Sequence, residues 1–277
     1  MHIMIKTYKI IYLAAILPIL LLYSCQKDGV HITPTIKAIN KNFSISGFVL
    51  GDTLEQYFDG VKMRDYYGQV RVTYNQNQMA FVTDEVNMEL RKKSTGETVY
   101  RQKFSIKDEE NVVPKFYFNG LQFSNGYTYP APQGDDYTAN FYVDKKGGAG
   151  LVDINIEVLE YYYDSTKPDP IVVVNTTVLP LAQNVKPGEW TPYVKMPVPV
   201  ATPQQSGTDL YPIVVVRDAQ TKEYYVNKNR DYSTINMELP YDGVSPGKVQ
   251  SMYMNKKPAD ANSFFLEYLD LVQLFPQ

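Results

Sequence analysis

The chain has very little cysteine and histidine: one cysteine and two histidines in 277 residues. The histidines are His2 and His31, and both precede the regularly patterned part of the chain. The remainder therefore lacks the side chains of Ser-His-Asp and Cys-His nucleophilic sites, and it also lacks the commonest general base. Zinc sites built from His or Cys are excluded there as well. An intrachain disulfide is impossible because no second cysteine exists.

Other familiar signatures are also missing. The chain has no Gly-x-x-x-x-Gly-Lys-Ser/Thr phosphate loop and no calcium loop with Asp at alternate positions, so we expect no cofactor. Its formal net charge of −3 argues against a nucleic-acid partner, since such proteins carry basic patches. Carboxylate-pair chemistry, as in glycoside hydrolases, remains open. Nothing marks out a pair among the candidates Asp135, Asp136, Glu157, Glu160, Asp164 and Glu267.

The first residues read as a signal peptide. Lys6 and Lys9 precede an uncharged apolar run over 10–22, and Ser24 is a small residue before the processing point. A transmembrane helix is the alternative. The run is shorter than the roughly 20 apolar residues that a bilayer requires, and Pro18 interrupts it. We therefore expect residues 1–24 to be removed.

Cys25 follows the sequence Leu22-Tyr23-Ser24. This segment resembles the lipobox of bacterial lipoproteins, although Tyr23 departs from the small or branched residue usual there. The resemblance implies that Cys25 is acylated, with chains such as palmitate, and becomes the mature N-terminus. Several acyl chains on one residue anchor a protein firmly, whereas one holds it marginally. Residues 25–42 are polar, contain Pro34 and have no clear period, as is typical of a flexible tether.

Period-two alternation dominates the rest of the chain and predicts an all-β protein. Val86, Met88 and Leu90 alternate with polar residues, and the same pattern recurs over 100–106 and 152–158. Asp-Gly and Asn-Gly pairs between such runs are strong hairpin signals. They occur at 59–60, 119–120, 125–126 and 242–243, and the pairs Gly51-Asp52 and Thr95-Gly96 add further turns. Many short strands with turns at this spacing indicate β-sandwiches or barrels.

A glycine-rich stretch at 145–150 predicts a flexible break between two sandwich domains, 43–145 and 151–277. The alternative is a glycine-rich hairpin within one large sandwich. Two segments in the second half, 188–197 around Trp190 and 264–274 around Asp270, resemble the jelly-roll, galactose-binding-like domains of carbohydrate-binding modules. The first carries Gly188-Glu189-Trp190, and the second resembles a closing strand that continues to Leu274. Leu271 stands where the second acid of a calcium site would be, so Asp270 is only a weak metal candidate. Trp190 is expected in the core.

Together with the lipobox, this arrangement resembles the surface lipoproteins of starch-utilisation-type glycan uptake systems. That resemblance implies an outer-membrane, lipid-anchored protein at the cell surface, which binds a glycan or another oligomeric nutrient beside an outer-membrane transporter complex. An accessory lipoprotein that binds a protein partner, such as a transporter subunit, a peptide-capturing protein or a fimbrial component, is the alternative. A glycoside hydrolase is a third reading, and we expect binding without catalysis.

Tyrosine, with 24 residues, supplies the candidate binding sites. Its ring combines an apolar body with a polar tip, as stacking on a sugar requires. One cluster is Tyr161-Tyr162-Tyr163-Asp164, in which alternation places Tyr161 and Tyr163 on one face. A second patch combines Tyr224, Tyr225, Asn227 and Arg230. The simpler interpretation of both patches is that they are half-buried strand tyrosines with polar neighbours.

A modification is also suggested. Asp52-Thr53-Leu54 and Asp164-Ser165-Thr166 resemble the Asp-Ser/Thr-x acceptor of a bacterial O-glycosylation system for exported proteins. The motif is short and also occurs by chance. The resemblance predicts Thr53 and Ser165 as acceptors, and intact-mass measurement checks this prediction.

Overall fold

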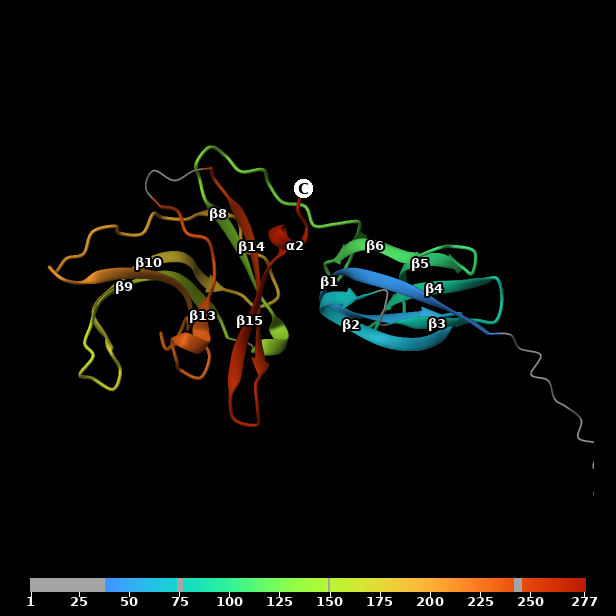
Figure 1. Cartoon of the computed structure of the whole chain (residues 1–277), viewed down its shortest axis with the longest axis horizontal. Coiled ribbons are helices and arrows are strands. Elements are labelled where there is room, and N and C mark those ends of the chain that lie inside the picture. Colours follow the sequence, from blue (N-terminus) through green and yellow to red (C-terminus); the bar gives the residue numbers. More distant parts are fainter. Residues whose placement is uncertain (1–37, 74–76, 149, 242–245) are drawn as a thin grey trace, which may run out of the picture.

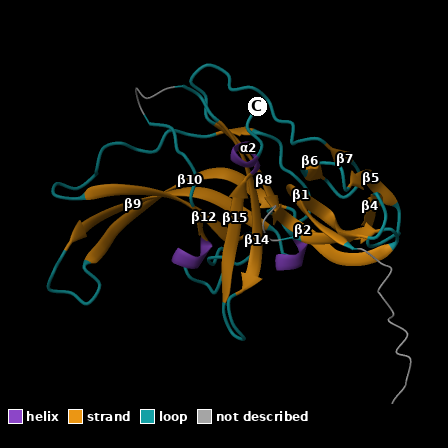
Figure 2. Cartoon of the chain, turned by 45° about the vertical axis from the view of Figure 1, so that its right-hand side comes forward, coloured by secondary structure: helices purple, strands orange, loops and turns teal. Residues whose placement is uncertain are grey.

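The computed structural model of the chain describes residues 38–73, 77–148, 150–241 and 246–277. Within these ranges the protein is built almost entirely of strands, arranged in two bodies (Figure 1). The helical elements are single turns next to strands (Figure 2). The predicted all-β sandwich class is therefore confirmed. No helix in the described part of the chain is long and apolar enough to cross a bilayer.

The N-terminal body is organised around one long, bent strand. This strand, β1, pairs antiparallel with β2 along most of its length, and it also pairs with β3, with β6 along its first half and with β4 along its second half. The predicted Asp59-Gly60 turn joins β1 to β2, and both residues have positive φ as an Asn/Asp-Gly hairpin requires. The strands are β1 (Ile39–Phe58), β2 (Val61–Val72), β3 (Gln78–Phe81), β4 (Glu85–Lys92), β5 (Thr98–Ser105), β6 (Asn111–Phe118) and β7 (Phe123–Ser124).

Alternate residues of these strands form the first core. The predicted inward positions of β4 (Val86, Met88 and Leu90) are buried there together with Phe104 of β5. Phe43, Phe58 and Phe104 form a group of aromatic rings with centroids 5.3–6.2 Å apart. Aromatic burial of this kind dominates core energetics.

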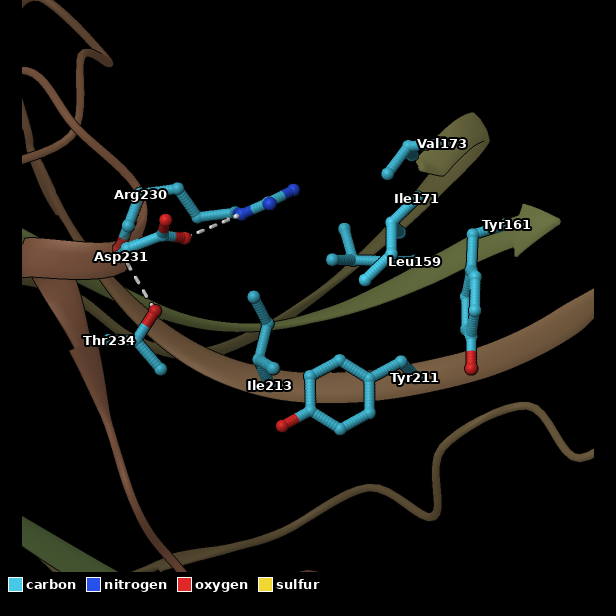
Figure 3. A pocket seen from close by; sticks show the side chains of 9 residues that line it. All are labelled: Leu159, Tyr161, Ile171, Val173, Tyr211, Ile213, Arg230, Asp231 and Thr234. Atoms are coloured by element: carbon cyan, nitrogen blue, oxygen red, sulfur yellow. Dashed lines mark hydrogen bonds and ion pairs between the residues drawn. The ribbon is translucent and has the colours of Figure 1, made fainter. Parts of the chain in front are cut away.

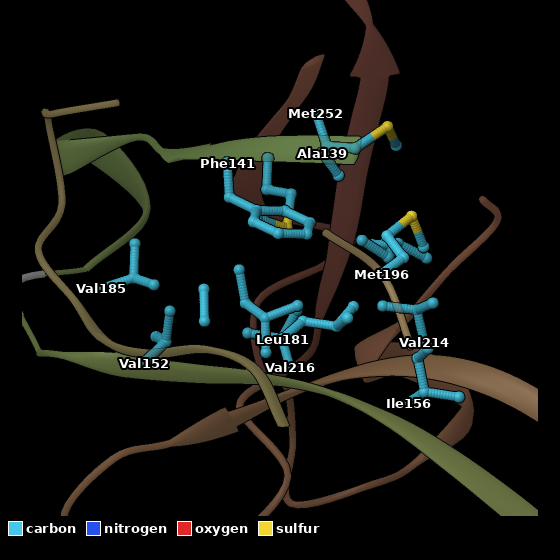
Figure 4. Close-up of a cluster of buried hydrophobic side chains, with 14 of the residues drawn as sticks. Ala139, Phe141, Val152, Ile156, Leu181, Val185, Met196, Val214, Val216 and Met252 are labelled. Atoms are coloured by element: carbon cyan, nitrogen blue, oxygen red, sulfur yellow. The ribbon is translucent and has the colours of Figure 1, made fainter. Parts of the chain in front are cut away.

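The C-terminal body is a sandwich of two four-stranded sheets, β10-β9-β12-β13 and β11-β8-β14-β15. Figure 4 shows residues of β9 and β12, such as Ile156 and Val214, facing Phe141 of β8 and Met252 of β14 across the core. The elements are β8 (Thr138–Val143), η2 (Lys145–Gly147), β9 (Val152–Tyr163), β10 (Ile171–Val185), β11 (Val194–Lys195), β12 (Asp209–Asp218), η3 (Asp231–Ser233), β13 (Thr234–Ile235), β14 (Val249–Pro258), β15 (Phe264–Asp270) and α2 (Leu271–Leu274).

Sheet membership places the domain division earlier than residues 145–151. Strand β8 pairs with β11 and β14 of the C-terminal body, so the bodies separate between β7 and β8. The glycine-rich stretch instead makes the turn from β8 to β9. A Cβ on Gly147 would lie 2.6 Å from the backbone nitrogen of Lys256, so glycine is needed for close approach to β14. The predicted tether is also too long, because β1 begins at Ile39 and pairs with β3 over 39–42.

The two bodies share an aromatic junction, which we define as Phe48, Leu50 and Tyr117 from the N-terminal body packed against Tyr142, Tyr253, Leu271 and Phe275. Trp190, expected in the core, is half-buried at this junction, and its Nε1–H donates to the Tyr117 hydroxyl at 3.3 Å. Asp144, next to the aromatic junction, has no exposed surface. Its Oδ2 accepts from the hydroxyls of Tyr67 (2.6 Å) and Tyr253 (2.8 Å), one from each body.

The predicted closing strand ends earlier than expected. Strand β15 stops at Asp270, and residues 271–274 form the helical turn α2. The Asp270 Oδ1 accepts from the backbone N–H groups of Ser251 and Val272, both at 2.9 Å, and the second of these bonds caps α2. Similarly, the 188–197 segment contributes only the two-residue strand β11. The jelly-roll likeness of this half stays a prediction.

Candidate functional site

The candidate site lies on the outer face of the β10-β9-β12 sheet. Residues 152, 154, 156 and 158 of β9 point into the sandwich core, so Leu159, Tyr161 and Tyr163 point outward. The strand register then aligns side chains across the sheet: Val173, Tyr161 and Asp209 form one row, and Thr176, Leu159 and Tyr211 form the next. This face is unusually apolar for an exposed surface. Tyr163 is 69 % exposed, Tyr211 58 % and Ile171 53 %.

A pocket of about 480 Å³ is recessed into this face. Its floor is made by Leu159 and Ile213, which are only 5 % and 9 % exposed, and Ile171 and Val173 border it from β10. The rings of Tyr161 and Tyr211 stand next to each other at one end (Figure 3). The pocket therefore offers two tyrosine rings next to an apolar floor, and it opens to solvent.

The opposite end of the pocket is polar. Arg230, Asp231 and Thr234 line it from η3 and its flanks, and the Arg230 side chain extends across the pocket from this end (Figure 3). The Thr234 hydroxyl donates to the Arg230 carbonyl oxygen at 2.9 Å, which fixes the backbone of the turn. The Arg230 Nε lies 3.5 Å from the Asp231 Oδ1, at the limit of a hydrogen bond.

A buried polar network continues the same face toward the start of β9. The Glu157 carboxylate has no exposed surface and accepts from the Arg217 guanidinium at 2.6–2.7 Å and from the Tyr224 hydroxyl at 3.0 Å. The same guanidinium lies over the Tyr224 ring, 3.9 Å from its centroid. Burial, followed by the Glu157 charge, raises the pKa of Tyr224. This network holds β9, β12 and the loop after β12 together, and its polar groups are already paired.

The structure brings part of the predicted binding set onto this one face. Tyr161 and Arg230, which came from two separate predicted patches, line the same pocket. Tyr163, two residues further along β9 on the same face, is exposed. Tyr224 lies in the Glu157 network, where its hydroxyl is already hydrogen-bonded. Their role in binding stays a prediction.

Other predicted binding residues lie elsewhere in structural contacts. The Tyr225 side chain packs against the sandwich core, with its hydroxyl 3.4 Å from the Gly147 carbonyl oxygen. The Asn227 side chain bonds the backbone of Phe264 twice: its Nδ2 donates to the carbonyl oxygen at 2.8 Å, and its Oδ1 accepts from the N–H at 3.2 Å. The Asp164 carboxylate accepts from the Thr166 hydroxyl and N–H, which lowers the pKa of Asp164. These contacts account for all three residues without a ligand.

The modification and anchor residues have different surroundings. Ser165 is exposed in the turn after β9, whereas Thr53 is half-buried in the bend of β1. Cys25 lies outside the described residues. Asp270 is tied to backbone N–H groups, and burial raises the pKa of its carboxyl. No cluster of three or more potential His, Cys, Asp or Glu metal ligands occurs within the described residues.

Two of the acidic residues considered for carboxylate-pair chemistry, Glu157 and Glu160, are buried on β9. Glu157 is buried on the outer face by Arg217 and Tyr224. Glu160 is 2 % exposed and points the other way, where its Oε1 accepts from the Thr208 hydroxyl and the Gln205 N–H. These bonds lower the pKa of Glu160. Alternation along β9 turns the two carboxyl groups to opposite sides of the sheet.

The sequence analysis missed most of the pocket lining. Apart from Leu159 of β9, the missed residues come from elements that approach β9 only after folding, so the strand order had to be known first. The one available signal was the continuous, mostly apolar run over 210–216. The missed lining residues are Leu159, Ile171, Val173, Tyr211, Ile213, Asp231 and Thr234.

Comparison with known proteins identifies no family for this chain. No protein-family profile matches it, and no curated protein sequence matches it. Among solved structures, a candidate adhesin of Bacteroides ovatus is 7 % identical, covers 82 % of this chain and 94 % of its own, and has a TM-score of 0.22. A candidate cell-adhesion protein of Bacteroides fragilis is 12 % identical, covers 80 % and 85 %, and has a TM-score of 0.19. Superposition at this level carries no argument about function, which therefore depends on the site itself.

Proposed function

We propose that this chain is a lipid-anchored protein of the outer-membrane surface that binds a glycan, as an accessory to an uptake transporter, without cleaving it. The observation that carries the proposal is the pocket on β9, β10 and β12, where the rings of Tyr161 and Tyr211 stand next to an apolar floor. Sugar rings present apolar C–H faces to which aromatic planes are complementary. The polar end of the pocket supplies partners for the hydroxyl groups.

The proposed binding is tested with the full-length protein purified in detergent and applied to a glycan array. We expect retention by at least one polysaccharide. Tyr161→Ala and Tyr211→Ala should each weaken binding about tenfold, because one well-placed ring contributes about 1.4 kcal/mol. Tyr268→Ala, on β15 of the other sheet, is the matched control, since Tyr268 is also exposed but does not line this pocket.

Two results would refute glycan binding at this pocket. One is the absence of retention by any glycan on the array. The other is equal binding by the Tyr211→Ala and Tyr268→Ala proteins, with unchanged circular dichroism. Release of reducing sugar from a bound polysaccharide would instead make the protein a glycoside hydrolase.

The anchor is tested separately. Protein purified from membranes should begin at Cys25, with an intact mass that includes acyl chains. Cys25→Ser should release the protein from the membrane fraction, because the acyl chains are the proposed attachment. A mature start at another position, or a Cys25→Ser protein that stays with the membrane, would contradict the proposed localisation. Protease accessibility on whole cells reports whether the protein faces outward.

A second candidate function, binding of a protein partner, is favoured by strand β10. This strand is at the edge of its sheet and has no charged residue in its 15 positions, and Ile171, Val173 and Val178 are exposed on it. Edge strands normally carry charges that prevent pairing with another chain. An extended segment of a transporter subunit, a captured peptide or a fimbrial component could add to this edge.

The two functions respond differently to one substitution. Val178 lies on β10 outside the pocket, so Val178→Lys should block strand addition by charge and leave glycan binding unchanged. Loss of a co-purified partner in this variant, together with no glycan retention by the parent protein, would favour the protein-binding function.

A further inference from the structure

The polar end of the pocket contains a guanidinium group, that of Arg230. Two arginines, Arg217 and Arg230, approach the outer face of this sheet, and their surroundings differ. The Arg217 guanidinium makes short contacts through all three nitrogens: Nε and Nη2 to Glu157 at 2.7 and 2.6 Å, and Nη1 to the Lys222 carbonyl oxygen at 2.8 Å. Its hydrogen-bonding capacity is committed to the fold.

The Arg230 guanidinium is largely uncommitted. Its Nε lies 3.5 Å from Asp231, longer than the 2.7–2.9 Å that is typical of charge-assisted bonds. Its two Nη groups have no hydrogen-bond partner among the described residues. The side chain extends over the pocket toward Ile171 and Val173, so the free Nη edge lies above the apolar floor (Figure 3). A guanidinium held there presents two parallel donors to whatever occupies the pocket.

We infer that the pocket selects an acidic sugar, with the two Nη groups of Arg230 holding the sugar carboxylate while Tyr161 and Tyr211 contact the ring. This inference rests on the proposed glycan binding and names the ligand class. A guanidinium fork matches the two oxygens of a carboxylate, which is why arginine rather than lysine serves in such contacts. Because the whole chain carries a formal net charge of −3, attraction of an anion requires a local cation of this kind.

Asp231 should have the opposite effect to Arg230 on binding of an acidic sugar. Its side chain is 80 % exposed at the same end of the pocket, where its negative charge repels a bound carboxylate. Removing the Asp231 charge should therefore strengthen binding of an acidic sugar, whereas removing the Arg230 charge should weaken it. A surface that attracted polyanions only by general charge would respond to any nearby cation. Lys228 tests this, because it is 74 % exposed, pairs with Glu223 and does not line the pocket.

The experiment compares uronate polymers with their own methyl esters, so that charge is the main chemical difference. The full-length protein in detergent is titrated with polygalacturonate, alginate and hyaluronate and with the methyl ester of each. We expect at least one acid to bind about tenfold or more tightly than its ester, with the difference decreasing as salt is raised. Arg230→Gln should reduce that acid-to-ester ratio about tenfold, Asp231→Asn should increase it, and Lys228→Gln should leave it unchanged.

The outcomes separate this inference from the proposed function. Binding of esters or neutral glycans in a Tyr211-dependent manner, with no acid preferred, overturns the acidic-sugar inference and leaves glycan binding standing. An acid preference that Lys228→Gln reduces as much as Arg230→Gln also overturns it, because the effect is then general electrostatics. No Tyr211-dependent binding of any glycan, acidic or neutral, overturns both proposals. Circular dichroism of each variant verifies that the fold is retained.

Discussion

At the scale of single residues, Glu157 shows how folding can give an acidic strand residue a buried role. In the sequence it alternates with apolar residues and resembles a solvated position. In the fold its carboxylate is covered by Arg217 and Tyr224, which come from β12 and from the loop that follows it. A buried charge of this kind is tolerated only because it is paired and hydrogen-bonded.

Glu157→Gln should therefore destabilise the protein more than a matched change on the surface. Removing the charge leaves the Arg217 guanidinium without its counter-ion, and we expect a loss of about 3 kcal/mol in the free energy of unfolding. Glu267→Gln is the control, since Glu267 forms an exposed pair with Lys257 and should cost less than about 1 kcal/mol. Urea denaturation of both variants measures the difference. Equal losses would show that the Glu157 network does not stabilise the fold.

At the scale of elements, β1 depends on two glycines for different reasons. Gly47 lies opposite Phe116 of β6, and a Cβ at this position would overlap the Phe116 carbonyl oxygen. Gly60, in the β1–β2 turn, has open space around it but a φ of +80°, which disfavours any residue with a Cβ. One glycine is needed for space and the other for backbone conformation.

The same substitution at the two positions should separate these effects. Gly60→Ala is expected to cost about 1 kcal/mol of unfolding free energy from turn strain, with the pairing of β1 to β6 retained. Gly47→Ala should cost about 2–3 kcal/mol, because β6 must move away from β1. Hydrogen exchange of the β6 amides provides the second readout. Faster exchange in β6 is expected for Gly47→Ala alone, and its absence would contradict the close-approach explanation.

Strands could be predicted from the sequence wherever apolar residues alternate regularly with polar ones. Strands β4, β5 and β9 follow this rule, because their apolar residues alternate with mostly polar ones in the sequence. The pocket could not be predicted, because Tyr211 reaches Tyr161 only through the pairing of β12 with β9, and local pattern contains no information on strand order. The domain division was misplaced for a related reason: glycines serve close approach as well as flexible linkers.

At the scale of the whole molecule, the aromatic junction joins the two bodies through buried phenols. Burial raises the pKa of Tyr142 to about 12, and burial also raises the pKa of Tyr117 and of Tyr253. For Tyr67, burial and the hydrogen bond to Asp144 both raise the pKa. The native state therefore holds these protons more tightly than the unfolded chain does.

The sign of the pH dependence follows from those shifts. The stabilising effect of each phenol is fully present below the unfolded pKa of about 10 and is lost as pH rises through its raised pKa, at about 1.4 kcal/mol per pH unit for each group. Between pH 10 and 12 the protein should lose stability steeply. Absorbance at 295 nm should show late-ionising tyrosines whose ionisation coincides with unfolding, and denatured protein should lack this phase. A single native titration near pH 10 with the fold retained would contradict the burial of these phenols.

The parallel pairing of β1 with β6 has a mechanical consequence. The chain enters the N-terminal body at one end of β1 and leaves it for the C-terminal body after β6 and β7, so a pull between the leading segment and the distal pocket stretches the two parallel strands in opposite directions. Their hydrogen bonds would then bear the load together in shear rather than separate one after another. We therefore expect this body to resist tension, which would suit the proposed lipid-anchored protein when flow pulls on a glycan bound at its other end.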